Sequence, residues 1–181
     1  MPEPAQAAAI QITALIGRTV LRVKSWFAES VSGGRPVVLA GQVLPSQVGA
    51  TVSEPLHVVC VGPGDWLIVS SEQPATRQSE RLECALALPG LAVVDLSDGL
   101  ASIDVRGPAA REVFSKGCGL DFHPRGFPVG RCARTRLAQV LVVIECIDDS
   151  PRFELTVARS YSRYLHAWLT DAAKEFRGSP T

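Results

Sequence analysis

The amino-acid sequence predicts an α+β fold with antiparallel or mixed sheets and about three helices. Short apolar, β-branched runs come in pairs joined by turn residues, not by helical crossovers. Amphipathic segments with helical spacing separate or follow these pairs. The 181 residues, of which 46% are hydrophobic and 20% charged, suit one globular unit with its own core. We therefore expect an N-terminal arm over residues 1–18 and a single domain over residues 19–177.

The N-terminal part of the sequence is weakly patterned. Residues 1–18 are rich in Ala and Pro near their start, which favours an arm, and weak alternation predicts a first strand over residues 19–26. A Ser-Gly-Gly stretch predicts a loop at residues 29–36. Scattered Pro and Gly residues predict irregular connections over residues 37–55.

The first clear signal is a β-hairpin. Apolar strands at residues 56–61 and 66–69 flank Gly62-Pro63-Gly64-Asp65, where Pro fixes φ and Gly permits a tight reversal. Apolar residues at helical spacing then predict a helix over residues 76–88, which Pro89-Gly90 ends.

A second hairpin and a short helix follow. The runs at residues 91–96 and 101–105 surround Ser97-Asp98-Gly99, which indicates a turn between two strands. Pro at the first helical position predicts a helix over residues 107–116, and Gly117 ends it.

The C-terminal part combines a long loop, three strands and a helix. Residues 117–131 contain too many Gly and Pro residues for regular structure, so we expect a loop that carries function. Strands are expected at residues 132–137, 140–147 and 153–157, and a helix at residues 160–176. The expected buried stripe of that helix is Tyr161, Leu165, Trp168, Leu169 and Ala172.

Motifs for nucleotide, metal and nucleophile chemistry are missing from the sequence. No Walker loop or Gly-x-Gly-x-x-Gly precedes a predicted helix, and no histidine has helical or knuckle spacing to another. His57, in an apolar strand, is expected to be a satisfied core or edge residue. Cys118 follows Lys116, which could lower its pKa, but it equally fits a small apolar residue at a helix end. We expect no catalytic, cofactor-binding or metal-binding residue in this chain.

Charge and cysteine usage indicate a reduced, soluble, cytoplasmic protein. The 18 Lys and Arg residues balance the 18 Asp and Glu residues, so the whole chain has no net attraction for nucleic acid or anionic lipid. The five cysteines show no metal or redox spacing. No basic residue precedes Arg18, and the longest later apolar run, residues 140–144, is far too short for a membrane span.

One segment is strongly basic. Residues 106–136 contain seven cations and two acids, which predicts a docking surface for an acidic partner or an anionic ligand. The candidate interface residues are Arg106, Phe122, Arg125, Phe127, Arg131, Arg134 and Arg136. The alternatives are a solvated face with intrachain ion pairs, and phenylalanines that fold back into the chain's own core. RNA binding is a weaker alternative, because the basic residues do not repeat along one face.

Several sequence blocks resemble a known family. The blocks are GPGDWL at residues 62–67, VDLSDG at 94–99, RGPAAR at 106–111, KGCGLDFHPRGFP at 116–128, GRCARTRLA at 130–138 and RSY at 159–161. Together they resemble the gamma subunit family of heterotetrameric sarcosine oxidase, from about residue 37 to residue 173. The resemblance implies a fold similar to the folate-binding domain of aminomethyltransferases.

The resemblance also implies an accessory role. In such complexes an N-methyl amine is oxidatively demethylated and the one-carbon unit passes to tetrahydrofolate. A beta subunit carries FAD and FMN, an alpha subunit carries NAD and the tetrahydrofolate site, and a delta subunit carries zinc. The gamma subunit packs chiefly against alpha and has no active site of its own. A stand-alone folate or one-carbon binding module is the alternative. The Lys-Gly-Cys-Tyr-x-Gly-Gln-Glu signature of folate-dependent iron–sulfur assembly proteins matches only at residues 116–118.

Overall fold

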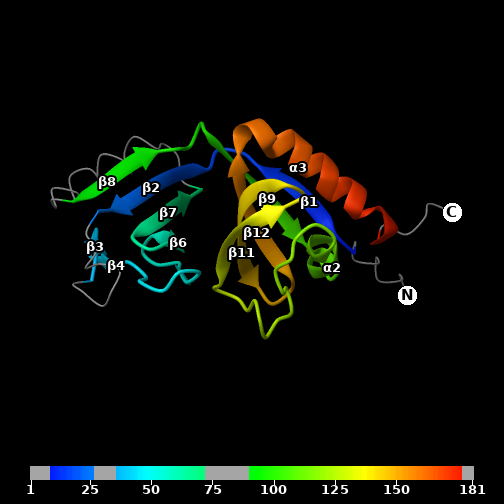
Figure 1. The fold of residues 1–181 in the computed structure, drawn as a ribbon, viewed down its shortest axis with the longest axis horizontal. Coiled ribbons are helices and arrows are strands. Elements are labelled where there is room, and N and C mark those ends of the chain that lie inside the picture. Colours follow the sequence, from blue (N-terminus) through cyan, green and yellow to red (C-terminus); the bar gives the residue numbers. More distant parts are fainter. Residues whose placement is uncertain (1–8, 27–35, 72–89, 177–181) are drawn as a thin grey trace, which may run out of the picture.

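The computed structural model describes residues 9–26, 36–71 and 90–176. These residues form two five-stranded sheets and one two-stranded sheet. The two larger sheets lie beside each other, and both described α-helices lie against the sheet that contains β9 and β12 (Figure 1).

The first sheet carries the larger core. Its strand order is β1-β9-β12-β11-β10, and all of its pairings are antiparallel. The strands are β1 (Gln11–Leu15), β9 (Leu100–Arg106), β10 (Cys132–Leu137), β11 (Val140–Asp148) and β12 (Arg152–Ala158). One face packs against helices α2 (Ala110–Ser115) and α3 (Arg159–Ala172), where Phe114, Leu165 and Leu169 are completely buried.

The second sheet is also antiparallel, with the order β5-β6-β7-β2-β8. Its strands are β2 (Thr19–Ser25), β5 (Thr51–Val52), β6 (His57–Gly62), β7 (Asp65–Ser70) and β8 (Leu91–Asp95). The short pair β3 (Val38–Leu39) and β4 (Gln42–Val43) adds Leu39 to its core. Trp66 is buried there, and its Nε1 donates a hydrogen bond to the carbonyl oxygen of Pro45 at 2.7 Å.

A smaller apolar cluster joins the two sheets. Val20, Val59, Val61, Leu67 and Val69 of the second sheet pack with Cys132 of β10. The bridge between Ala50 and Arg131 adds backbone hydrogen bonds across the same boundary. The two sheets are therefore held together by packing as well as by the chain connections.

Most expected elements are confirmed. The antiparallel α+β class is as predicted, and β6 and β7 form the expected hairpin, with Cys60 opposite Trp66. Strands β2, β10, β11 and β12 lie within one or two residues of their predicted bounds. Helix α2 begins at Ala110, later than predicted, and the last helix is divided into α3 and the 3-10 helix η2 (Lys174–Phe176).

Three expectations are wrong. Residues 11–15, which the sequence places in the arm, form β1 because β9 supplies a complete antiparallel partner strand. The supposed irregular stretch at 37–55 contains β3, β4 and β5. The runs at 91–96 and 101–105 are not a hairpin, because β8 pairs with β2 in one sheet and β9 pairs with β1 and β12 in the other.

Two further points concern helices. Tyr161 is exposed and does not belong to the buried stripe of α3, which consists of Leu165 and Leu169 with Trp168 and Ala172 partly buried. The predicted helix at 76–88 and most of the predicted loop at 29–36 lie outside the described residues.

Candidate functional site

The predicted interface residues do not gather on one surface. Phe122 and Phe127 are buried in the main core, with ring centroids 5.7 Å apart and further ring contacts to Phe153. Both rings therefore fold back into the chain's own core, which was the alternative to an interface role for the two phenylalanines. Neither side chain is available to a partner of the folded chain.

Arg111 explains how the loop at 117–131 is held. Its guanidinium donates hydrogen bonds to the carbonyl oxygens of Phe122 and Phe127, and it lies 5.0 Å from the ring centroid of Phe153. The middle of the loop is thus fixed from inside the molecule, and backbone hydrogen bonds of Gly130 and Arg131 hold its end. This segment contains no helix or strand, as predicted.

The arginines of the basic segment divide into engaged and unengaged groups. Arg106 pairs with buried Asp104 at 2.6 Å. Arg125 is exposed in the loop, and Arg131 lies over Gly49. Neither Arg134 nor Arg136 of β10 forms an ion pair within the described part of the chain, and both are exposed.

An apolar groove lies beside Arg134. It has a volume of about 330 Å³ and is formed by both sheets and the start of α3. Leu141 and Tyr161 at this groove are 51% and 54% exposed. Arg22 also lines the groove, and its hydrogen bonds to Asp65 lower the pKa of that carboxyl, to which the charge of Arg134 adds. Large apolar side chains therefore meet water beside an arginine that has no ion-pair partner.

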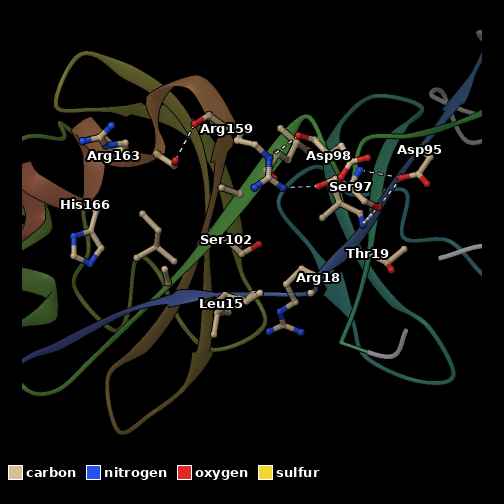
Figure 2. Close-up of a pocket in the computed structure, with 18 of the residues that line it drawn as sticks. Leu15, Arg18, Thr19, Asp95, Ser97, Asp98, Ser102, Arg159, Arg163 and His166 are labelled. Carbon is tan, nitrogen blue, oxygen red and sulfur yellow. Dashed lines mark hydrogen bonds between the residues drawn. The ribbon is translucent and has the colours of Figure 1, made fainter. Parts of the chain in front are cut away.

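A second, larger pocket of about 850 Å³ opens at the end of β1 (Figure 2). Three separate segments line it: residues 14–20, residues 95–103 and the side of α3 that carries Arg159, Arg163 and His166. Sequence reasoning missed this pocket, because no single segment carries a recognisable signal for it.

Hydrogen bonds fix the corner between the two sheets at one side of this pocket. Arg159 donates to the carbonyl oxygens of Ser97, Asp98 and Leu100 at 2.6–2.9 Å. Ser97 donates from both its backbone N and its Oγ to Asp95 (Figure 2). The wall at residues 95–100 is therefore preorganised.

The opposite side of the pocket carries unengaged polar groups. The side chains of Arg163 and His166 have no hydrogen bond or ion pair within the described ranges. Ser102 of β9 is only 2% exposed, and its Oγ is a buried oxygen without a hydrogen-bond partner in the described part of the molecule. The pocket thus combines a fixed wall with an arginine and a histidine that have no partner among the described residues.

A row of carboxylates faces the second sheet. Asp104, Glu154 and Glu145 lie directly opposite one another on β9, β12 and β11, and all three are buried. Arg18 pairs with Glu154 at 2.5 Å and His57 pairs with Glu145 at 2.8 Å. The hydrogen bond to Glu145 raises the pKa of His57, whereas burial raises the pKa of Glu154. These pairs join the sheets electrostatically.

His57 also contacts Ser53, whose Oγ lies 3.3 Å from Nδ1. A serine, a histidine and an acid in one line is the arrangement of a nucleophilic hydrolase. However, the nearby backbone N–H groups of Thr51 and Leu56 are already bound, to Gly130 O and Gln42 Oε1. With these neighbouring amides engaged, the line is best explained as structural, as expected for His57.

Burial disfavours the thiolate form of three cysteines, and no metal-binding cluster is found among the described residues. Within residues 9–26, 36–71 and 90–176, no group of three or more His, Cys, Asp or Glu side chains could hold a metal ion. Burial raises the pKa of the Cys132 thiol to about 12 and also raises those of Cys60 and Cys146. In the same described ranges, no helix is long and apolar enough to cross a membrane.

Comparisons with known proteins identify the family. The model of the sarcosine oxidase, gamma subunit family matches residues 35–175. The chain belongs to this sarcosine oxidase gamma subunit family. Sarcosine oxidase gamma subunits from Corynebacterium sp. (strain U-96) and Arthrobacter sp are 32% and 34% identical over 138 and 143 residues. The matches cover 75% and 78% of this chain and only 66% and 68% of those relatives.

Solved structures agree with the sarcosine oxidase gamma assignment. A chain of heterotetrameric sarcosine oxidase from Corynebacterium sp. U-96, in complex with pyrrole 2-carboxylate, is similar with a TM-score of 0.82 and 26% identity. That similarity covers 98% of this chain and 90% of the other. Aminomethyltransferase T of the glycine cleavage system from Bartonella henselae is similar with a TM-score of 0.62 and 15% identity, over 90% and 45% of the two chains. The second likeness shows the fold alone, and it confirms the expected aminomethyltransferase-like fold.

The match to the gamma subunit family includes every candidate interface residue. It also includes the parts of the 850 Å³ pocket that belong to β9 and α3. The pocket wall at residues 14–20 lies outside the matched range.

Proposed function

We propose that this chain is the accessory gamma subunit of a sarcosine-oxidase-like heterotetramer. The complex would oxidatively demethylate an N-methyl amine and pass the one-carbon unit to tetrahydrofolate. The observation that carries the proposal is the likeness to a heterotetrameric sarcosine oxidase chain, which extends over 98% of this chain. The family match over residues 35–175 supports it.

The cofactors are assigned to other subunits. As the family resemblance implies, FAD and FMN belong to a beta subunit, NAD and tetrahydrofolate to an alpha subunit and zinc to a delta subunit. The alpha subunit is the chief partner, and the cytoplasm is the compartment. No membrane or nucleic-acid partner is part of this proposal.

The docking surface is the apolar groove and the exposed side of β10. Leu141 and Tyr161 offer apolar area that a partner would remove from water, and Arg134 and Arg136 would face acidic residues of that partner. Arg125 and Arg131 do not line this groove, so they are weaker candidates. Arg106 is a weaker candidate because Asp104 already binds it.

The test is purification of the tagged chain from cells that also express the other subunits of the proposed complex. We expect a flavin-coloured complex that oxidises sarcosine or a related N-methyl amine. A colourless monomer with folate affinity would instead support the stand-alone folate module. Binding to RNA that weakens steeply with salt would support the RNA-binding alternative.

The surface itself is tested with Leu141→Asp and the matched control Val48→Asp, whose side chain is 47% exposed and lies outside the groove. We expect Leu141→Asp to weaken association at least tenfold. Val48→Asp should leave association unchanged. Equal effects of both variants, or none from Leu141→Asp, would place the partner elsewhere.

A further inference from the structure

We propose that the pocket at the end of β1 is a binding site for a small organic carboxylate with an apolar body. The site is formed by this chain alone, and its lining differs from that of the groove at the docking surface except at Leu100. It would give the chain a ligand-binding activity in addition to its role as a subunit.

The size and walls of the pocket suit a small molecule. Its volume of about 850 Å³ falls in the range of small-molecule sites, which is roughly 300–1,000 Å³. Leu15, Leu100 and Ile103 contribute apolar surface, and Ala101 and Ala167 leave space because their side chains are short. An apolar ring or chain can therefore be buried between β1, β9 and α3.

The Arg163 guanidinium favours a ligand with a negative charge. Arg163 and His166 are three residues apart on α3, so they lie on the same side of the helix. Neither has a partner among the described residues, unlike Arg159, which binds three carbonyl oxygens, and Arg18, which binds Glu154. Arg163 is exposed and His166 is half-buried, so a carboxylate can reach both from solvent.

The acids of the pocket determine the orientation of the ligand. Asp95 and Asp98 belong to the corner on the opposite side from His166 and Arg163 (Figure 2). Their charge disfavours an anionic group at that end and leaves the α3 side as the place for the carboxylate.

Ser102 provides an independent indication of a ligand. A buried hydroxyl without a partner costs free energy, so such groups are rare in native structures. Ser102 lines this pocket between Leu15 and the corner, and Figure 2 shows its hydroxyl between Arg18 and Arg159. Because its neighbours Ala101 and Ile103 face the core that contains α3, Ser102 points to the other face of β9. A polar substituent at the end of the ligand opposite the carboxylate would therefore satisfy it.

The experiment is a calorimetric titration of the purified full chain with benzoate. Benzyl alcohol tests the need for the charge, and inorganic phosphate tests the need for the apolar body. We expect saturable one-to-one binding of benzoate, with both other compounds at least tenfold weaker.

Variants locate the binding. Arg163→Gln should weaken benzoate about tenfold or more, because it removes the charge-assisted contact. Ser102→Ala should weaken a hydroxybenzoate more than it weakens benzoate. The matched control Arg136→Gln, which removes an exposed arginine outside the pocket, should change nothing. Absence of saturable binding, equal affinity for benzyl alcohol, or an equal loss in Arg136→Gln would overturn the proposal.

Discussion

Arg18→Gln is the sharpest test of how the two sheets are held together. Arg18 lies between β1 and β2, and its Nη2 is 2.5 Å from Oε2 of Glu154. Glu154 has Glu145 and Asp104 directly opposite it on the neighbouring strands. Removing the guanidinium would leave a buried carboxylate between two others.

The expected loss of stability is about 2–3 kcal/mol near pH 8. Breaking a buried ion pair typically costs about 3–5 kcal/mol, and a hydrogen bond to a charged group contributes about 1.5–3 kcal/mol. The side chains of Arg18 and Glu154 are 21% and 10% exposed, so solvent screens part of the interaction. The lower end of these free-energy ranges therefore applies. A loss of about 2–3 kcal/mol is still a large share of the free energy of unfolding of a typical domain.

The loss should depend on pH in a defined direction. Burial raises the folded-state pKa of Glu154 above its ordinary value. Ionised Glu154 therefore costs stability above that folded pKa, and protonation relieves the cost as the pH falls through it. Arg18→Gln should accordingly be most harmful at pH 8 and much milder near pH 5. Glu154→Gln should abolish most of this pH dependence.

Urea unfolding of the wild type, both single variants and the double variant at pH 5 and pH 8 measures the effect. The double variant should recover most of the stability lost in Arg18→Gln at pH 8. A loss from Arg18→Gln below about 0.5 kcal/mol, or one that is equal at both pH values, would refute this account of the carboxylate row.

Three further predictions follow from single contacts. The hydrogen bond to Glu145 raises the pKa of His57 in the folded chain. The stability that this pair contributes should therefore be complete below about pH 6.5 and lost as the pH rises through the folded pKa. Urea unfolding of His57→Gln and wild type between pH 6 and pH 8 checks this. Phe127→Ala should destabilise the isolated chain by about 3–5 kcal/mol, because the ring is in the core; unchanged thermal stability with weaker association would restore its role as an interface residue. Cys132, with a pKa of about 12, should resist alkylation by iodoacetamide at pH 8 until urea unfolds the chain, as mass spectrometry can show.

Local sequence signals predicted most of the longer strands but not all of their partners. The β6–β7 hairpin follows from Gly62-Pro63-Gly64-Asp65, because both strands and the turn lie within one short segment. The similar signal at 91–105 does not give a hairpin, because the chain passes from the second sheet to the first at the turn Ser97–Gly99. Leu96 N donates to Val20 O, and Arg159 binds the carbonyl oxygens of the corner. Such long-range bonds leave no mark in the local pattern.

The N-terminal strand and the large pocket were missed for a related reason. The sequence at 11–15, QITAL, alternates weakly, and it becomes a strand only because β9 supplies its hydrogen-bond partners. The pocket is formed by three segments that are distant in the sequence. Composition shows which residue types are present, but it cannot show which of them face one cavity.

The charge count of the basic segment overstates the charge that a partner would meet. Of the seven cations between residues 106 and 136, Arg106 binds Asp104, Arg111 binds loop carbonyl oxygens, and Lys116 binds Glu175 and the carbonyl oxygen of Ala172. The remaining four are Arg125, Arg131, Arg134 and Arg136. The two arginines of β10 lie next to the exposed side chains of Leu141 and Tyr161, so electrostatic steering and apolar burial favour the same place. An acidic partner is therefore expected to dock on β10 and the groove, and not on the glycine- and proline-rich loop.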